Sequence, residues 1–321
     1  MALGVSHRKS GESQEIKALE AGVDEYGSSE SFQLYTEASS VMACSRQQII
    51  GCDVSLSIDS VVVEEPLQII LNYLDLDGIP KEREYLVTMR TPGDDRNLVT
   101  GLLLAEGVIQ YASDIVGMND HLDLDELAPN EITVRLSPRL RVDWSKISRE
   151  TSSFSSCGVC GKSSMKSLEL RDIPSLDTQS HWLTDQTVLA LSNNLRQQQA
   201  LFETTGGVHG GGLFDEDGQL LAISEDIGRH NALDKLLGAR ARDNSLTELG
   251  KVVMLTSRIS FELVQKVLVA GVPVLVAAGA PSNLALNMAK RFNLTLIGFN
   301  QQGRFNVYHG AFRLRLHKTN K

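Results

Sequence analysis

Two cysteines, Cys157 and Cys160, are the residues of this sequence whose type and spacing most directly indicate chemistry. They lie in the stretch SSCGVCGKSS, at positions 155–164, which otherwise consists mostly of serine and glycine. Glycine opens backbone conformations that other residues avoid, so we do not expect the thiols to be held rigidly. Such a pair can bind a metal ion, form a disulfide or carry sulfur.

A metal site is the first alternative for the pair. A structural zinc site takes four protein ligands and a catalytic one about three, whereas the pair supplies two. The remaining cysteines, Cys44 and Cys52, lie in a polar N-terminal region. His209 or His230 could complete a ligand set, but no ligand spacing supports either, and we expect no bound metal.

A redox role and a sulfur-carrying role remain. A thioredoxin-like Cys-x-x-Cys lies where a strand enters a helix, but here the pair follows a serine-rich segment, which disfavours that role. A sulfur carrier needs an exposed thiolate near a positive charge, and Lys162 lies two residues after Cys160. Because a second thiol can attack a persulfide and release its terminal sulfur, the residue types favour a sulfur carrier.

The composition of the 321-residue chain disfavours several classes of protein. Its 31 basic and 40 acidic residues give a net charge of −9, opposite to the basic footprint of nucleic-acid-binding proteins. No apolar run approaches the ~18 residues of a membrane span, and the N-terminus lacks the apolar core of a secretory signal. We therefore expect a cytoplasmic protein that binds neither nucleic acid nor membrane.

Changes in composition divide the chain into four parts. Residues 1–58 are polar and weakly periodic, and we expect a disordered extension there. Residues 59–145 predict a small α+β domain, and residues 146–184 a flexible linker that contains the thiol pair. Residues 185–315 predict an α/β domain.

The small domain contains one clear helical pattern. Positions 93–107 predict a helix that Asp94 or Asp95 caps and Gly107 ends. The alternating stretch at 130–138 predicts a strand.

The larger domain opens with three local patterns. Apolar residues at helical spacing predict a helix over 185–202. A hairpin follows, with its turn at Asp217 and Gly218. The next helix is predicted to have Asp226 as its N-cap and Gly238 just past its end.

The last third of the chain predicts a β-α-β-α-β unit. Dense apolar runs at 251–258, 272–283 and 294–304 alternate with helical segments, which is typical of parallel strands buried on both faces. The carboxyl ends of such strands meet at one edge of the sheet, where ligands bind. Three clusters would lie at this edge: Thr256–Arg258, Ala280–Asn283 and Phe299–Arg304.

These clusters favour a ligand that carries phosphate, although a simpler interpretation exists for part of them. Two lie at predicted helix N-termini, where free N–H groups attract anions. Ser282 can serve as an N-cap alone. Arg258 and Arg304 are not needed for capping, so they point to an anionic ligand.

Two segments with histidine precede the unit. TTGGVHGGGLFD, around His209, is not a phosphate-binding P-loop, because no Gly-Lys-Ser/Thr follows. Each histidine alone is typical of a hydrogen-bonded structural residue. The segment SEDIGRHNALDK, however, is densely polar, and we predict that its side chains form one wall of a binding site. Its polar residues are Glu225, Asp226, Arg229, His230, Asn231, Asp234 and Lys235.

Long motifs in this order resemble the FdhD family of formate dehydrogenase accessory sulfurtransferases. They are TPGDDRNLVTGLLLAEGVI, CGVCG, TGGVHGGGLF, EDIGRHNALDKLLG, LTSRISFELVQK, AGVPVLVAAGAPSNLAL and LTLIGFNQQGRFNVY. The resemblance covers residues 59–310 and leaves out the N-terminal extension.

The resemblance implies a function, partners and a fold. Proteins of this family take persulfide sulfur from a cysteine desulfurase and pass it to the molybdenum bis(guanine dinucleotide) cofactor, which then enters formate dehydrogenase. The family implies a homodimer. It also implies a cytidine deaminase-like three-layer domain beside a smaller N-terminal α+β domain.

The resemblance assigns site residues as well. Cys157 takes the position of the persulfide and Cys160 assists it. The family's cofactor-binding stretch maps to Phe299, Asn300, Gln301, Gln302, Gly303 and Arg304. The other predicted binding residues are Ser257, Arg258, Ser282, His209, Arg229 and His230.

Two other functions deserve comparison with this one. A zinc deaminase carries His-x-Glu followed by Pro-Cys-x-x-Cys. Here Gly210 and Gly211 follow His209, and the cysteine pair precedes the histidine, so we reject deamination and keep the fold. A chaperone that binds the cofactor without moving sulfur stays open as the alternative.

Overall fold

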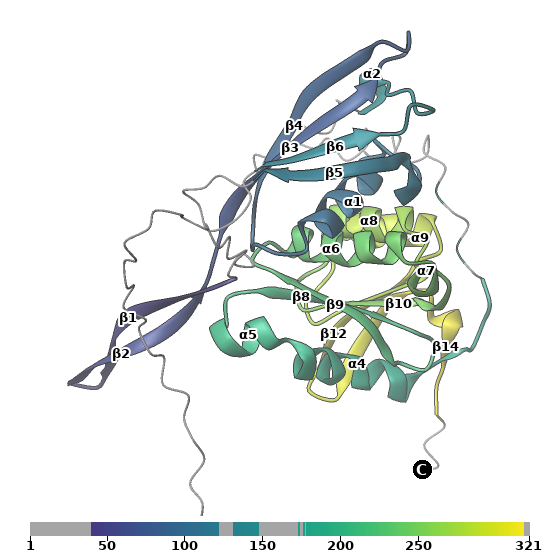
Figure 1. Cartoon of the computed structure of the whole chain (residues 1–321). Helices are drawn as coiled ribbons and strands as arrows, with labels where there is room; N and C mark the ends of the chain where they lie inside the picture. The colour runs from purple at the N-terminus through teal and green to yellow at the C-terminus, as the bar shows by residue number, and fades with distance from the viewer. Residues whose placement is uncertain (1–39, 122–130, 148–172, 174–175, 177, 318–321) are drawn as a thin grey trace, which may run out of the picture. The chain divides into compact units, whose positions relative to one another are not determined.

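The computed structural model describes residues 40–121, 131–147, 173, 176 and 178–317 (Figure 1). Cys157 and Cys160 lie outside these residues, so their roles stay predictions. Part of 146–184 lies outside them too, and the predicted domain boundaries likewise stay predictions. Among the described helices, none combines the length and hydropathy needed to cross a membrane.

A four-stranded sheet with one long helix forms what we call the small lobe. The strand order is β4-β3-β6-β5, and only the β3–β6 pair is parallel. One face of the sheet packs on α1 through a core that includes Leu67, Ile69 and Leu103. The elements are β3 (Glu65–Leu74), β4 (Pro80–Arg90), α1 (Asp95–Ala105), η1 (Ala112–Asp114), β5 (Ile115–His121), β6 (Glu131–Leu136) and α2 (Trp144–Ile147).

The helix predicted over 93–107 is confirmed as α1, but its cap differs in detail. Asp94 is the N-cap residue in a left-handed conformation (φ 57°), and its side chain forms no capping hydrogen bond. Asp95, inside the first turn, instead pairs with the buried guanidinium of Arg90, with Oδ1 3.0 Å from Nε. Gly107 follows the helix with φ 72°, a conformation that costs glycine little.

A six-stranded sheet is the centre of what we call the large lobe, residues 178–317. Its strand order is β13-β12-β11-β10-β8-β9. The strands are β8 (His209–Phe214), β9 (Leu220–Asp226), β10 (Val252–Leu255), β11 (Val274–Ala277), β12 (Thr295–Gln301) and β13 (Arg304–His309). The helices are α4 (Asp185–Gln198), α5 (Ala200–Thr205), α6 (Arg229–Arg242), α7 (Asn244–Leu249), α8 (Phe261–Val269) and α9 (Asn283–Arg291). Short elements complete it: β7 (Leu183–Thr184), η2 (Ala311–Arg313) and β14 (Leu314–Arg315).

The predicted β-α-β-α-β unit is confirmed, because β10, β11 and β12 are parallel neighbours joined by α8 and α9. The sheet is mixed rather than purely parallel. β8 pairs antiparallel with β10, and β13 pairs antiparallel with β12. The hairpin of β8 and β9 was also predicted correctly, with Gly218 at φ 83° in its turn.

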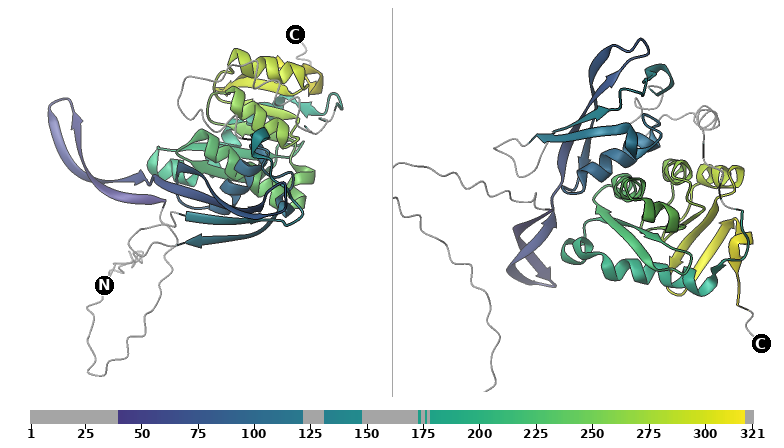
Figure 2. Two further views of the ribbon diagram at one scale, coloured as in Figure 1. Left: turned by 90° about the horizontal axis from the view of Figure 1, so that it is seen from above. Right: turned by 45° about the vertical axis from the view of Figure 1, so that its right-hand side comes forward.

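Helices cover both faces of the large sheet (Figure 2, right). Val253 and Leu255 of β10 belong to the core shared with α6, α8 and α9. Val252 and Met254 of the same strand face α4. The alternation follows from the two-residue period of a strand, and it shows why these strands are apolar at every position.

The prediction for α6 is wrong at both ends. Asp226 belongs to β9, and the N-cap residue is Gly228. Gly238 lies inside the helix, where it faces α1 of the small lobe. A Cβ atom at Gly238 would overlap the carbonyl oxygen of Asn97, and one at Gly101 would overlap the carbonyl oxygen of Asp234. The two glycines therefore let α1 and α6 cross with their backbones in contact.

The prediction of disorder for residues 1–58 is wrong for residues 41–58. A hairpin of β1 (Val41–Ile50) and β2 (Asp53–Val62) lies there, with all ten residues of each strand in register. Its tight turn uses Gly51 at φ 64°. Each strand alone is polar enough to look unstructured, and only the cross-strand pairing gives it a defined conformation.

The α1–α6 crossing predicts whether an alanine at Gly238 stabilises or destabilises the protein. In an ordinary helix Gly→Ala raises the free energy of unfolding by about 0.5–1 kcal/mol. Gly238→Ala is expected to lower it by about 2 kcal/mol, because the new methyl group overpacks the crossing. Urea unfolding followed by circular dichroism measures the change. Ala239→Gly, one residue away, is the control and should cost about 1 kcal/mol by helix propensity. A more stable Gly238→Ala variant would contradict the crossing.

Candidate functional site

Five strands of the large sheet contribute to one edge. The parallel strands β10, β11 and β12 end there, β8 begins there, and β9 ends there because it runs antiparallel to β8. His209, the first residue of β8, pairs in register with Asp226, the last residue of β9. The two histidine-containing segments are thus brought to the edge where the strand-end clusters were predicted.

The end of β10 is tied to the start of β8 by two hydrogen bonds. The hydroxyl oxygen of Thr256 accepts from the N–H of Gly210 at 2.9 Å, and the N–H of Thr256 donates to the carbonyl of Gly210 at 3.0 Å. Ser257 is buried, and its hydroxyl donates to the carbonyl of Arg258. The Ser257 side chain is therefore already used within the protein.

The loops after β10 and β11 interlock through their backbones. The N–H groups of Gly279 and Ser282 donate to the carbonyls of Ser257 and Ile259. A Cβ atom at Gly279 would lie 2.9 Å from Cα of Arg258, so glycine is needed for this approach. The result is a rigid backbone platform from which the Arg258 side chain extends into solvent.

Ser282 has the simpler of its two predicted roles. Its hydroxyl oxygen accepts from the N–H of Ala285 at 3.1 Å, which is the N-cap hydrogen bond of α9. The residue is exposed at the sheet edge, so capping does not remove it from the predicted site.

The stretch from Phe299 to Arg304 forms the β12–β13 hairpin. Phe299 has φ 56°, interrupts the register, and donates its N–H to the carbonyl of Gly279. Gln301 pairs with Arg304 across Gln302 and Gly303, at φ 54° and 74°. Two positive φ values in a two-residue turn match the type I′ hairpin.

The six residues of this stretch do not share one surface. The side chain of Asn300 is buried and donates to the carbonyl of Val188 in α4, at 2.6 Å. Phe299 is half-buried beside the loop that contains Gly279. The remaining four residues, Gln301, Gln302, Gly303 and Arg304, are exposed.

Three guanidinium groups at or near the edge have no acidic partner. Arg229, Arg258 and Arg304 form no ion pair with any residue that the structure describes. Burial lowers the pKa of His209, and the positive charges of Arg229 and His230 lower it further. A neutral histidine beside unpaired cations suits an anionic ligand, because the histidine then offers one N–H donor and one acceptor.

His230 has a carboxylate partner that the sequence analysis missed. Its Nε2 lies 3.1 Å from Oε2 of Glu262, and the hydroxyl of Ser260 lies 3.2 Å from the same oxygen. Hydrogen bonding to His230 lowers the pKa of Glu262. A serine at the N-cap position followed by a carboxylate in the first turn of α8 was the available signal.

Much of the predicted polar wall instead holds the two lobes together. Nζ of Lys235 lies 2.8 Å from Oδ2 of Asp226 and donates to the carbonyl of Thr91 at 2.7 Å. The N–H of Thr91 donates to Asp226, and the amide of Asn231 donates to the carbonyl of Met89. These side chains are buried and bonded to the small lobe, and Lys235 also lines a cavity beside β9, so their contact with a ligand stays a prediction.

Two acidic residues of the same run also have internal partners. Asp234 is buried against the ammonium of Lys266, at 2.8 Å. The carboxylate of Glu225 accepts from the N–H groups of Leu201 and Phe202 at the start of α5. Only Arg229 and His230 of the run remain available to a ligand at the edge.

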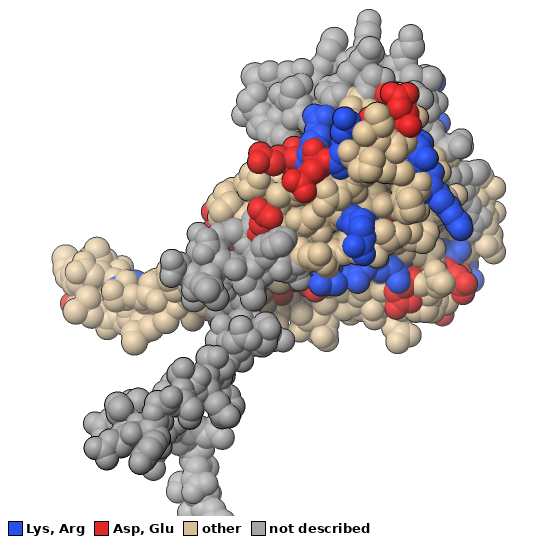
Figure 3. Space-filling view, turned by 45° about the horizontal axis from the view of Figure 1, so that its top comes forward, with Lys and Arg blue, Asp and Glu red and all other residues tan. Residues whose placement is uncertain are grey.

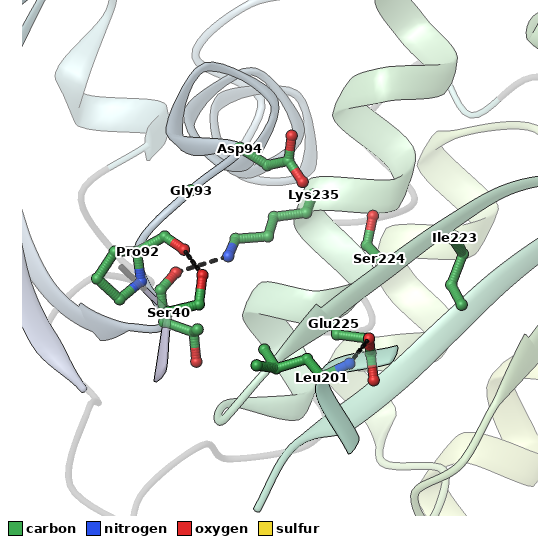
Figure 4. Close-up of a pocket in the computed structure, with 10 residues that line it drawn as sticks. Ser40, Pro92, Gly93, Asp94, Leu201, Ile223, Ser224, Glu225 and Lys235 are labelled. Atoms are coloured by element: carbon green, nitrogen blue, oxygen red, sulfur yellow. Dashed lines mark hydrogen bonds between the residues drawn. The ribbon is translucent and has the colours of Figure 1, made fainter. Parts of the chain in front are cut away.

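A cavity of about 240 Å³ lies beside β9 (Figure 4). It is lined by Ser40, Thr91, Pro92, Gly93, Asp94, Leu201, Ile223, Ser224, Glu225 and Lys235. Ser40 donates to the carbonyl of Pro92, Lys235 donates to Thr91, and Glu225 is held by α5. The cavity is smaller than the ~300–1,000 Å³ typical of ligand pockets, and most of its charged groups are paired. We therefore place the candidate site at the sheet edge.

No group of three or more His, Cys, Asp or Glu side chains within the described residues could hold a metal ion. Cys44 and Cys52 are free thiols of the β1–β2 hairpin, distant in sequence from the edge. The candidate site therefore consists of Arg229, Arg258 and Arg304, which form no ion pair with a described residue, together with His209 and the His230–Glu262 pair, on a backbone platform.

Comparisons with known proteins identify the family. The family model described as FdhD/NarQ matches residues 62–315. Sulfur carrier protein FdhD of Streptomyces coelicolor is 40% identical over 276 residues, which cover 82% of this chain and 92% of that protein. The protein of the same name from Nocardia farcinica is 42% identical over 259 residues, covering 80% and 88%.

A solved structure agrees with the fold. A formate dehydrogenase accessory protein from Desulfotalea psychrophila matches with a TM-score of 0.65 and 23% identity, covering 86% of this chain and all of that one. The match over residues 62–315 spans both lobes and every residue of the candidate edge. The chain belongs to the FdhD/NarQ family.

Proposed function

We propose that this chain is a sulfur carrier that passes persulfide sulfur from a cysteine desulfurase to the molybdenum bis(guanine dinucleotide) cofactor of a formate dehydrogenase. The observation that carries the proposal is 40% identity to a protein named sulfur carrier over 92% of that protein's length. The accessory-protein name of the Desulfotalea psychrophila structure points to the same enzyme.

The chemistry of the thiol pair follows from thiol exchange. The thiolate of Cys157 attacks the terminal sulfur of the donor persulfide, a new S–S bond forms, and the donor thiolate leaves. Cys160 then attacks Sγ of Cys157, which forms a disulfide and releases hydrosulfide to the cofactor. A cellular thiol reduces the disulfide afterwards. The requirement for reduced thiols supports the cytoplasm as the location.

The cofactor is the substrate in this scheme, and the sheet edge is its binding site. Arg229, Arg258 and Arg304 supply positive charge for the phosphates, as unpaired guanidinium groups do in many proteins. His209 lies close enough to Arg229 and His230 for their positive charges to lower its pKa. The remaining contacts would come from Ser257, Ser282 and the residues Phe299–Arg304. We also propose a cytidine deaminase-like layering for the large lobe. Such a layering would place the ligand at the carboxyl edge of the parallel strands.

The sulfur-carrier proposal and the chaperone alternative differ in whether the protein accepts sulfur. Incubation with a cysteine desulfurase and cysteine is expected to add the mass of one sulfur atom to Cys157, because its thiolate is the acceptor. Mass spectrometry of tryptic peptides locates the adduct. Cys157→Ala should lose it, and Cys44→Ala, the matched control, should retain it. Bound cofactor without any adduct would favour the chaperone.

Cofactor binding at the edge is tested with guanosine diphosphate as the probe. Arg304→Ala is expected to weaken its affinity about tenfold, which corresponds to ~1.4 kcal/mol for one charge-assisted contact. Isothermal titration calorimetry measures the dissociation constant. Arg83→Ala removes an exposed arginine of the small lobe and serves as the control. Equal affinities of the wild type and the Arg304→Ala variant would remove Arg304 from the site.

A further inference from the structure

The cavity beside β9 is lined by three parts of the fold, and none of its lining residues belongs to the candidate site at the sheet edge. Gly93 comes from the loop before α1, Ser224 and Lys235 come from β9 and α6, and Leu201 comes from α5 (Figure 4). Its volume of about 240 Å³ has room for roughly eight groups of the size of a water molecule. The cavity therefore suits a much smaller ligand than a dinucleotide.

Ser224 faces this cavity with a hydroxyl that the protein does not use. The residue is 6% exposed, and its hydroxyl forms no hydrogen bond with any residue that the structure describes. It shares a face of β9 with Asp226, which meets Lys235 of α6, because side chains alternate along a strand. A buried hydroxyl without a partner is costly and rare in native proteins, so this one points to a ligand.

Lys235 offers a second donor to the cavity. Its ammonium group carries three N–H donors, of which Asp226 and the carbonyl of Thr91 accept two. Within the described part of the chain, the third N–H has no acceptor. The side chain lines the cavity and is 2% exposed, so bulk water does not satisfy this donor. The third N–H is therefore available to a ligand.

Asp94 adds a group of the opposite charge. An aspartate at an N-cap position normally accepts a hydrogen bond from the first turn of its helix, but the carboxylate of Asp94 makes no such bond. It pairs with no other residue that the structure describes, and it lines the cavity. The backbone of Asp94 has φ 57°, a conformation uncommon outside glycine. Residues held in this way cluster at functional sites.

The charges around the cavity disfavour two simple classes of ligand. Asp226 already neutralises Lys235, so a bare anion would face the uncompensated carboxylates of Asp94 and Glu225. A simple cation would lie near the ammonium of Lys235 and would leave its third N–H without an acceptor. A ligand that carries one charge of each sign satisfies both ends of the cavity.

The surface charge of the molecule agrees with such a ligand. The face drawn in Figure 3 shows basic and acidic side chains interspersed, with no broad area of one sign. A surface of one sign steers charged ligands toward a site from a distance. A zwitterion needs no such steering, since its two charges cancel beyond the site.

We propose that the cavity binds a free α-amino acid with a small side chain, in its zwitterionic form. The ammonium group of the ligand pairs with the carboxylate of Asp94, and the carboxylate of the ligand accepts hydrogen bonds from Lys235 and Ser224. Leu201 and Ile223 supply apolar lining for the side chain of the ligand. The inference goes beyond the sulfur-carrier function and depends neither on sulfur transfer nor on cofactor binding.

Binding is tested with L-alanine as the probe, by isothermal titration calorimetry on the full-length chain. We expect a dissociation constant of about 1 mM or lower. Propionate lacks the ammonium group of alanine, and ethylamine lacks its carboxylate. Each analogue leaves one end of the cavity unpaired, so each is expected to bind at least about tenfold more weakly than alanine. Glycine and L-valine probe the size of the side chain.

Two variants test the location of the ligand. Asp94→Asn keeps the shape of the side chain and removes its charge, and it should weaken alanine binding about tenfold. Ser224→Ala removes one hydrogen bond and should weaken it at least about threefold. Glu248→Gln neutralises an exposed carboxylate of α7 and serves as the control, with an affinity equal to that of the wild type. Neither cavity variant loses a bond within the protein, so thermal unfolding should match the wild type.

The absence of any heat of binding for L-alanine, glycine and L-valine at about 10 mM would overturn the proposal. So would an analogue that binds as tightly as alanine, or an unchanged dissociation constant in either cavity variant. Affinity for guanosine diphosphate, measured on the same samples, should be the same in both cavity variants as in the wild type. A parallel loss of that affinity would assign the cavity to the cofactor site and contradict the proposal.

Discussion

The crossing of α1 and α6 at Gly101 and Gly238 is the constraint on which the rest of this structure depends. Because the backbones of α1 and α6 are in contact at these glycines, β9 and the start of α6 lie against the loop before α1. That closeness allows Lys235 to reach both Asp226 and the carbonyl of Thr91. Buried charges are stable only when they are paired and hydrogen-bonded, so the network forms only if the helices cross at this distance.

The same constraint determines which polar residues remain for function. The contact between the lobes uses the side chains of Asp226, Asn231 and Lys235. Two other residues of the same segment, Arg229 and His230, lie at the sheet edge. Asp226 ends β9, and along α6 the helical geometry separates Asn231 and Lys235 from Arg229 and His230, because residues one or two positions apart point in different directions. One short polar sequence therefore serves both as the joint between the lobes and as part of the candidate site.

The backbone at the sheet edge is held in place by contacts between its loops. The loops after β10 and β11 are fixed by backbone hydrogen bonds and by the close approach at Gly279. Arginine side chains extend from this platform, as suits the recognition of phosphates by a preorganised site. The thiol pair lies on a different segment rich in glycine and serine.

Local periodicity by itself determined α1, the β8–β9 hairpin and the parallel β10–β11–β12 unit, because spacing along the chain reports which face of an element is buried. The clusters Thr256–Arg258 and Phe299–Arg304 could be assigned to one edge for the same reason. Tertiary structure alone decided that Gly238 is a crossing point, that Asn300 turns to α4, and that Glu262 meets His230. Each of these three features depends on a contact between residues far apart in sequence. Tertiary packing determines which such contacts form, and no local pattern encodes it. The β1–β2 hairpin was not predictable in this way, because residues 1–58 are weakly periodic, and only pairing between the two strands places Ile49, Val54, Leu56 and Ile58 on one face.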